Sequence, residues 1–168
     1  MSIRVTLTWS EYHLAVYCGA LRILESAKMK AKDHKVERGD PVDNDVQAAA
    51  AEMAAGKALN QYWGAGVNTF RQPDIGRNIE VRRTPYPNGK LRVAPKDRDD
   101  RPFVLVRGTV PDFEVVGWIY GRDAKQECWK GNPHNDGDVY LVPQEALQAF
   151  DDAALSAHPC QPNSCNNK

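Results

Sequence analysis

An alanine-rich segment in the first half of the chain sets the strongest limit on the fold. Residues 46–63 have the sequence VQAAAAEMAAGKALNQYW, and Asp43 or Asn44 before them is a suitable N-cap. Alanine has the highest helix propensity, so the segment predicts a helix that ends near Trp63. Because so many of its side chains are small, we expect the backbone of this helix to pack closely against other elements on more than one side.

One carboxylate interrupts this helix. Glu52 has Ala48, Ala55, Gly56 and Leu59 as helical neighbours, so no cation on the same helix can pair with it. If this face is buried, the charge requires a metal ion, a hydrogen-bond network or a raised pKa. The alternative is that Glu52 points to solvent along an imperfect stripe, and for this residue taken alone we expect the alternative.

The residues before this helix predict a strand and a first helix. Residues 3–7 alternate apolar and polar side chains, and Thr8 or Ser10 then caps a helix to about Met29. Charged residues dominate from 28 to 38, which predicts a fraying helix end and a mobile loop. Large apolar residues recur in the first helix at three- and four-residue steps and predict its core face: Trp9, Leu14, Tyr17, Leu21 and Leu24.

The residues after the alanine-rich helix change to an extended pattern. Strands are predicted at 79–84, 91–94, 102–108, 113–120 and 139–142. The first two are expected to pair across the Asn88-Gly89 turn, and the next two across a short turn at 111–112, in an antiparallel meander of three or four strands. A helical turn is expected from Arg122, and a last helix from Pro143 through Phe150.

Length and charge limit the class of protein. The chain has 168 residues, and we expect one domain over residues 1–152 and a flexible tail over 153–168. Its 22 basic and 22 acidic residues cancel, which argues against a protein that coats nucleic acid through a positive field over its whole surface. Residues 71–101 nevertheless hold nine basic and five acidic side chains, which predicts either a local basic groove or an ordinary solvated hairpin surface.

The sequence also bears on the compartment. Residues 1–8 lack the continuous apolar run of a secretory signal, and no run reaches the length of a membrane span, so we expect a cytoplasmic protein without a membrane partner. The scattered cysteines indicate reduced thiols rather than a disulfide scaffold. The alternative is a zinc site, although the spacing matches no compact knuckle: Cys128, His134, His158, Cys160 and Cys165.

The residues that carry chemistry lie between 73 and 82, in the sequence PDIGRNIEVR. Asp74 precedes a Gly-Arg-Asn turn, and the strand that follows carries Glu80 and, one same-face step later, Arg82. Two carboxylates brought together across a tight turn are able to hold a hard divalent ion, and an adjacent cation is able to stabilise charge on a phosphate. This arrangement predicts half of a metal-dependent phosphodiesterase site.

The order of these residues and elements resembles the PD-(D/E)XK, or restriction-endonuclease-like, phosphodiesterase superfamily. In that family an acidic residue often comes from the helix before the sheet, an aspartate begins a strand hairpin, and a D/E-x-K triplet follows; Glu52, Asp74 and Glu80-Val81-Arg82 occur here in that order. Residues 46–147 are also similar to small phage-encoded proteins that share the D-x-G-x-x-x-E-V-R run and a G-W-I-x-G segment, here residues 117–121.

The resemblance implies an α/β (α+β) fold, with N-terminal helices followed by a central mixed sheet and flanking helices. It implies a nuclease that cleaves DNA or RNA in a host cytoplasm, with DNA favoured as the substrate. Glu52, Asp74 and Glu80 would hold Mg²⁺ or Mn²⁺, and Asp74, Glu80 and Arg82 would be catalytic. The basic residues expected to follow the nucleic-acid backbone are Arg77, Arg83, Lys90 and Arg92.

One departure from the family pattern affects the proposed chemistry. Arg82 stands where the family has lysine, and a guanidinium stays protonated and cannot act as a general base. Lys57 and Lys96 are the alternative sources of a lysine.

The alternative function is a catalytically inactive, nuclease-fold accessory protein that binds a nucleic acid or a host protein, or forms a homodimer. Its contact patch would include aromatic residues, although aromatics in strands more often belong to a core: Tyr86, Trp118, Tyr120 and Trp129. The sequence contains no P-loop, G-x-G-x-x-G, G-x-S-x-G or H-E-x-x-H motif.

Overall fold

The computed structural model describes residues 2–28, 41–67, 69, 72–133 and 137–150. The helices are α1 (Trp9–Lys28), α2 (Pro41–Ala58) and the short α3 (Gly121–Ala124), with 3₁₀ turns at Glu127–Trp129 and Gln144–Ala146. The strands are β1 (Ile3–Thr6), β2 (Glu80–Thr84), β3 (Leu91–Val93), β4 (Pro102–Thr109), β5 (Asp112–Tyr120), β6 (Lys130–Gly131) and β7 (Val139–Val142).

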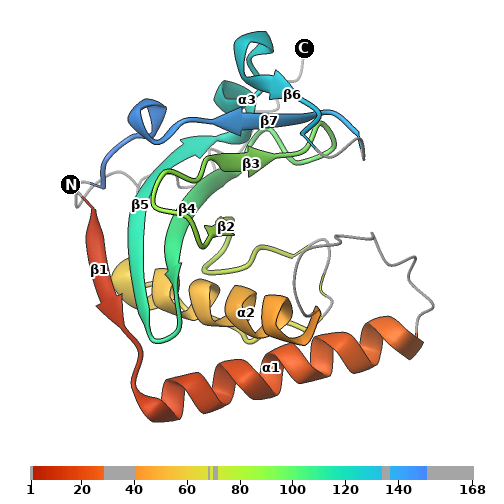
Figure 1. Ribbon diagram of the computed structural model, residues 1–168, viewed down its shortest axis with the longest axis vertical. Coiled ribbons are helices and arrows are strands. Elements are labelled where there is room, and N and C mark those ends of the chain that lie inside the picture. The colour runs from red at the N-terminus through yellow and green to blue at the C-terminus, as the bar shows by residue number, and fades with distance from the viewer. Residues whose placement is uncertain (1, 29–40, 68, 70–71, 134–136, 151–168) are drawn as a thin grey trace, which may run out of the picture.

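Two sheets make up the strand layer (Figure 1). The larger sheet has the order β1-β5-β4-β2, in which β5 is antiparallel to both β1 and β4 while β2 is parallel to β4. The smaller sheet, β3-β7-β6, is antiparallel. These helices and sheets confirm the predicted α+β class, and the restriction-endonuclease-like core stays a prediction.

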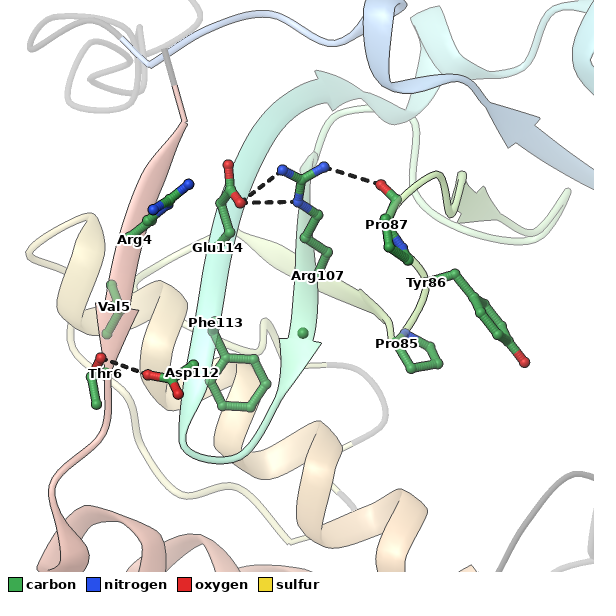
Figure 2. Close-up of a pocket in the computed structure, with 11 residues that line it drawn as sticks. Arg4, Val5, Thr6, Pro85, Tyr86, Pro87, Arg107, Asp112, Phe113 and Glu114 are labelled. Atoms are coloured by element: carbon green, nitrogen blue, oxygen red, sulfur yellow. Dashed lines mark hydrogen bonds and ion pairs between the residues drawn. The ribbon is translucent and has the colours of Figure 1, made fainter.

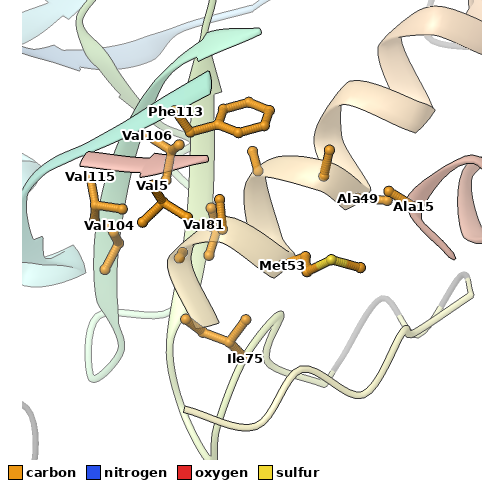
Figure 3. Packing of buried hydrophobic residues seen from close by; sticks show 14 of the residues in the cluster. Val5, Ala15, Ala49, Met53, Ile75, Val81, Val104, Val106, Phe113 and Val115 are labelled. Atoms are coloured by element: carbon orange, nitrogen blue, oxygen red, sulfur yellow. The ribbon is translucent and has the colours of Figure 1, made fainter. Parts of the chain in front are cut away.

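The alanine-rich helix lies between α1 and the larger sheet, as expected (Figure 1). Five of its alanines are fully buried: Ala49, Ala50, Ala51, Ala54 and Ala55. Figure 3 shows strand valines on one side of α2 and Ala15 of α1 on the other. Small side chains on opposite faces therefore let one helix contact a helix and a sheet together.

A second core covers the opposite face of the larger sheet. Phe103 and Leu105 of β4 alternate with Val104 and Val106, so successive residues belong to different cores. Phe103 and Leu105 pack with Leu91 and other residues of the smaller sheet. The strand β4 thus joins the two hydrophobic clusters.

The structure corrects the predicted core face of α1. Trp9, Tyr17 and Leu24 are 70%, 64% and 57% exposed, whereas Ala15, Cys18 and Gly19 are buried. A Cβ atom at Gly19 would lie 2.7 Å from the Cα atom of Val46, so the two helices approach backbone to backbone. Close approach requires the small residues of α1 to face α2, and this places its large apolar residues outside.

The structure also corrects the predicted hairpin between residues 79–84 and 91–94. A turn forms, since the Gly89 amide donates to the Tyr86 carbonyl oxygen at 3.1 Å, but β3 then pairs with β7 in the other sheet. Strand β2 pairs instead with β4, in parallel. The Asn-Gly signal therefore predicts the turn correctly, but the pairing of the strands on its two sides wrongly.

Other predicted elements differ in outcome. The first strand, the start of α1, the β4–β5 hairpin and β7 are confirmed. Glu11 and Thr8 exchange side chain–backbone hydrogen bonds of 2.6 and 3.3 Å, which caps α1. The last helix is wrong, because the backbone of Gln148 pairs with that of Trp118 at the sheet instead.

Two further predictions concern membrane-spanning helices and the segments outside the described residues. Within the described residues no helix has the length and apolar character needed to cross a membrane. The loop over 29–38, the tail over 153–168 and the zinc alternative's residues His134, His158, Cys160 and Cys165 lie outside the described residues.

Candidate active site

Strand β2 is an edge strand, and its two faces carry different chemistry. Glu80 and Arg82 are in register with Phe103 and Leu105, so they lie on the face turned away from α2. Val81 between them belongs to the cluster around α2. The alternation of one short strand therefore anchors the strand in one core and presents a carboxylate and a guanidinium on the other side.

A tight turn brings Asp74 back to this strand. Ile75 and Ile79 are almost fully buried and exchange backbone hydrogen bonds of 3.2 and 3.3 Å across the turn. Gly76 lies in the left-handed region, with φ of +58°, which favours glycine. The Val81 amide then donates to Asp74 Oδ2 at 2.7 Å, which fixes the carboxylate at the open edge of β2.

Arg82 is the centre of a charged cluster on the face of β2 that is turned away from α2. Its Nη1 lies 3.6 Å from Asp74 Oδ2 and 3.5 Å from Glu80 Oε2. Its Nη2 lies 3.3 Å from Asp97 Oδ2, and its guanidinium carbon lies 5.0 Å from the centre of the Phe103 ring. One guanidinium thus faces three carboxylates and rests on an aromatic ring.

Two further contacts hold the carboxylates of this cluster. Arg101 Nη1 donates to Glu80 Oε1, so that carboxylate faces two guanidiniums. Asp97 Oδ2 accepts a 2.9 Å hydrogen bond from the Ala94 amide, which positions it after β3. The backbone and the arginines therefore fix each acidic side chain around Arg82.

Glu52 occupies a buried position on α2 and does not point to solvent, which corrects that expectation. The residue is 7% exposed, and its two oxygens accept hydrogen bonds of 2.8 and 2.6 Å from Arg22 of α1. Trp63 Nε1 donates to the same carboxylate at 3.1 Å. A hydrogen-bond network therefore meets the charge, which is one of the three solutions expected for a buried carboxylate.

Arg22 is held firmly in this network. Burial disfavours its charge, but the hydrogen bonds and the negative charge of Glu52 outweigh that effect and raise the pKa of Arg22. Its Nε also donates to the Gly66 carbonyl oxygen at 2.9 Å. The ion pair thus ties α1, α2 and the segment after α2 together.

Asp74 differs from the other described carboxyl groups with a shifted pKa, since its pKa is raised and theirs are lowered. Burial, with the nearby negative charges of Glu52 and Glu80, raises the pKa of Asp74 from 3.8 to about 7, against the opposing effects of the Val81 amide and Arg82. A carboxyl group that exchanges its proton near neutral pH is typical of a functional site. Glu52 therefore influences the site electrostatically from the other side of β2.

The structure brings together Asp74, Glu80 and Arg82, and places Glu52 close enough to affect Asp74. Sequence analysis missed the arginines and the aspartate that complete the network: Arg22, Asp97 and Arg101. Arg22 could have been found from its position on the small-residue side of α1, three and four residues after Gly19 and Cys18. The incorrect choice of core face concealed that signal.

The basic residues predicted to follow nucleic acid differ in setting. Arg77 in the tight turn and Lys90 before β3 are exposed, as is Arg92 in β3. Arg83 lies on the other face of β2, where its Nε donates to the Gly108 carbonyl oxygen at 3.1 Å, and burial lowers its pKa. Their binding of nucleic acid stays a prediction.

The alternative lysine and the aromatic patch are also placed. Lys57 pairs with Glu11 at 2.9 Å, at the start of α1, and Lys96 is exposed. Trp118 is buried in the core, and Tyr120 and Trp129 pack partly buried against the two clusters. Of the four aromatics, Tyr86 alone is strongly exposed, so the predicted aromatic patch is wrong.

A separate hollow of about 520 Å³ lies beyond the end of β2, between β1, β4, β5 and residues 85–87 (Figure 2). Arg107 on its wall donates to Glu114 at 2.7 and 3.0 Å, and Thr6 donates to Asp112 at 2.7 Å. Of its charged side chains, Arg107 and Glu114 are thus paired with each other, and Asp112 is held by the Thr6 hydroxyl. The carboxylates around Arg82 do not line it.

The cluster around Arg82 has a donor set suited to a hard cation. Among the described residues, no three His, Cys, Asp or Glu side chains form a metal-holding group. Mg²⁺ requires fewer, since it commonly binds through one or two carboxylates with water and substrate phosphate as the other ligands. Asp74 and Glu80 fit that requirement, whereas both oxygens of Glu52 already accept hydrogen bonds.

Comparison of the chain with models of known families, with curated proteins and with solved structures gives no match. The function of this chain is therefore inferred from the geometry of this site.

Proposed function

We propose that this protein is a metal-dependent nuclease that hydrolyses phosphodiester bonds, with the cluster around Arg82 as its active site. One observation carries the proposal: oxygens of Asp74 and Glu80, from a turn and a strand, lie 3.6 and 3.5 Å from the same nitrogen of Arg82. Two carboxylates that converge at one point are suited to hold a divalent ion, and the guanidinium beside them is suited to contact a phosphate. The element order and the Glu52, Asp74, Glu80-x-Arg82 pattern support a restriction-endonuclease-like core.

Asp74 and Glu80 would hold Mg²⁺ or Mn²⁺ in this proposal. When bound, such an ion polarises the scissile phosphate and lowers the pKa of the attacking water. Glu52 acts through its charge, since it favours the protonated form of Asp74 when no cation is bound. Cation binding would then release that proton from Asp74.

The arginines supply the positive charge at the reaction centre. Arg82 is able to donate to a phosphate oxygen and to offset charge that develops there, but it cannot accept a proton from water. Arg101 holds Glu80 by an ion pair and so fixes its position. The exposed Arg77 in the adjacent turn is able to contact the next phosphate along a bound nucleic-acid strand. The family resemblance favours DNA over RNA as that nucleic acid.

The alternative, an inactive accessory protein, also has a specific observation in its favour. Arg82 already lies among Asp74, Glu80 and Asp97, so an internal cation neutralises the carboxylates without a metal. A site that has lost its lysine and become a salt-bridge cluster would have this arrangement. The protein would then act by binding a nucleic acid or a host protein.

Cleavage assays distinguish the two functions. Single- and double-stranded DNA and RNA are incubated with Mg²⁺ or Mn²⁺ and with wild type, Asp74→Asn or Glu80→Gln. We expect metal-dependent cleavage by wild type and at least a roughly 100-fold loss in each variant, because each removes a charged ligand. Glu114→Gln, at an arginine-paired carboxylate outside the site, is the matched control and should retain activity.

Two further measurements define the outcome. Calorimetry with Mn²⁺ should show binding to wild type and Glu114→Gln and weakened binding to Asp74→Asn. Arg82→Lys should keep cleavage if a cation is all that this position requires. Absence of cleavage on every substrate, together with absence of Mn²⁺ binding by folded wild type, would contradict the nuclease and favour the accessory protein.

A further inference from the structure

The outward side of α1 is an apolar surface without a partner among the described elements. We define the outer face of α1 as Trp9, His13, Val16, Tyr17, Ala20 and Leu24, which lie along one side of the helix. The large members are strongly exposed, whereas the residues toward α2 are small. Close packing on α2 explains the small residues on the inward side, but an outward side that faced only solvent would normally carry polar and charged residues.

The outer face carries no Asp, Glu, Lys or Arg residue. Its aromatic end is preorganised: the Trp9 ring lies 4.8 Å from the His13 ring, edge to face, and 5.7 Å from the Tyr12 ring. Aromatic anchors that are already held in place lose little freedom on binding, and residues of this type dominate the binding energy of interfaces.

The size of the face is in the range of an association surface. From their exposed fractions, Trp9, Tyr17, Leu24 and Val16 present on the order of 400–500 Å². The largest apolar patches on monomers are about 300–600 Å² and are often functional. A standard interface buries about 800 Å² per partner, so this face supplies the apolar centre and Leu14 with neighbouring polar residues would supply the rim.

We propose that the outer face of α1 pairs with the same face of a second copy, with the two helices antiparallel about a two-fold axis near Val16 and Tyr17. That midpoint between Trp9 and Leu24 places Trp9 against the partner's Leu24 and His13 against the partner's Ala20. Each larger side chain then meets a smaller one, so the surface is complementary to itself, as a two-fold interface requires.

The charge of the molecule favours this partner over others. A nucleic acid needs cations to meet its phosphates, and the outer face has none. An anionic membrane surface requires basic residues beside the apolar stripe. Within the described helix α1 the arginine and the lysine are engaged elsewhere, since Arg22 is paired inward with Glu52 and Lys28 pairs with Glu25 at 2.6 Å. The chain has no net charge, so two copies approach without overall repulsion.

The dimer would bear on the site through α1. Arg22, on the side of α1 opposite the outer face, is the residue that clamps Glu52. Association therefore holds in place the helix that supplies the Arg22 charge, without covering the carboxylates around Arg82. Nuclease activity is not needed for this inference, so its test is separate from that of the proposed function.

Sedimentation equilibrium measures the predicted association. Wild type should have twice its monomer mass of 18.8 kDa at micromolar concentration. Tyr17→Arg buries a charge at the centre of the interface, so we expect it to raise the dissociation constant by roughly 100-fold or more. Tyr62→Arg, at a tyrosine that is 81% exposed on the segment after α2, is the matched control and should remain dimeric.

Cross-linking checks the position of the axis, in a chain with Cys128, Cys160 and Cys165 replaced by Ser. Val16→Cys lies beside the axis, so a short bis-maleimide should join its two copies. Ala27→Cys is also on the outward side, but its copies would lie about 30 Å apart and should not be joined. A monomeric wild type, or equal cross-linking at both positions, would overturn the proposal; far-UV circular dichroism confirms that each variant is folded.

Discussion

The carboxyl group of Asp74 illustrates how a single residue here combines conflicting requirements. The group accepts a hydrogen bond from the Val81 amide and faces Arg82, and both contacts favour its ionised form. Burial and the negative charges of Glu52 and Glu80 favour its protonated form. The second set of effects dominates and raises the pKa of Asp74 to about 7. Above about pH 7, when no cation is bound, the protein therefore holds this carboxylate at a cost in stability.

We predict that Asp74→Asn stabilises the metal-free protein at pH 8. The folded protein keeps the Asp74 proton up to about pH 7, whereas the unfolded chain releases it near 3.8. The folded state therefore binds more protons between these values, and its stability falls as the pH rises through them. Asparagine does not titrate, so the gain should be about 1–3 kcal/mol at pH 8 and should vanish near pH 4.

Urea unfolding in EDTA at several pH values measures this difference. Asp100→Asn is the control, because the hydrogen bonds and charge of Arg98 lower the pKa of Asp100 and no gain at pH 8 is expected there. A variant of Asp74 that is less stable than wild type at pH 8 would contradict the assigned balance of charges.

The pair of Arg22 and Glu52 predicts a different pattern. Removal of one member leaves the other charged and buried, so Arg22→Met or Glu52→Gln should each cost about 3–5 kcal/mol in the free energy of unfolding. The double variant should cost clearly less than the two together, and a double-mutant cycle from thermal unfolding measures this coupling. Glu25→Gln, in an exposed pair with Lys28, should change stability by less than about 0.5 kcal/mol.

Single residues of the site were predictable where the chemistry is local. The turn after Asp74 and the two-residue period of the strand were enough to bring Asp74, Glu80 and Arg82 together. Arg22 reaches Glu52 across a contact between two helices, and nothing in local spacing specifies that contact. Interactions between distant segments depend on which face of each helix is buried.

At the scale of elements, the contact between α1 and α2 shows why the core face of α1 was predicted wrongly. Periodicity identifies an apolar stripe but does not say whether the stripe meets the core or another molecule. The approach of Gly19 to Val46 is a matter of volume, not of hydrophobicity. The β2–β3 hairpin failed similarly, because the Asn-Gly turn specifies a reversal but not the sheet in which the next strand pairs.

Gly19→Ala tests this close contact. Helix propensity alone would make alanine more stable by about 1 kcal/mol. The added Cβ would lie 2.7 Å from the Val46 main chain, so we expect a net loss of about 1–3 kcal/mol in urea unfolding. Ala20→Gly, on the outer face, removes helix propensity without touching α2 and should cost no more than about 1 kcal/mol.

For the molecule as a whole, the decisive feature is that β4 and β5 belong to both hydrophobic clusters. Val104 faces α2 and Leu105 faces the smaller sheet, although they are neighbours in the chain. A disturbance on either face therefore reaches the same pair of strands. The sequence indicated the two strands, but not that a second sheet would cover their other face.

We predict a single unfolding transition for both clusters. Leu105→Ala should cost about 2–5 kcal/mol and Val104→Ala about 1–3 kcal/mol, since both side chains are fully buried. Each should lower the unfolding midpoint of both clusters equally, as measured by hydrogen exchange of α2 and β7 in urea. Separate midpoints for α2 and β7 would show that the clusters unfold independently.

The contact between Asp74 and the Val81 amide has a last consequence, for solubility. An edge strand with free amides invites a strand of another molecule to add to it, and proteins often block such edges with charged groups. Here the Asp74 carboxylate, which the proposed chemistry needs, also accepts a hydrogen bond from the Val81 amide on the open side of β2. Asparagine at position 74 still offers an acceptor oxygen, whereas alanine would leave this amide open to strand addition and to aggregation.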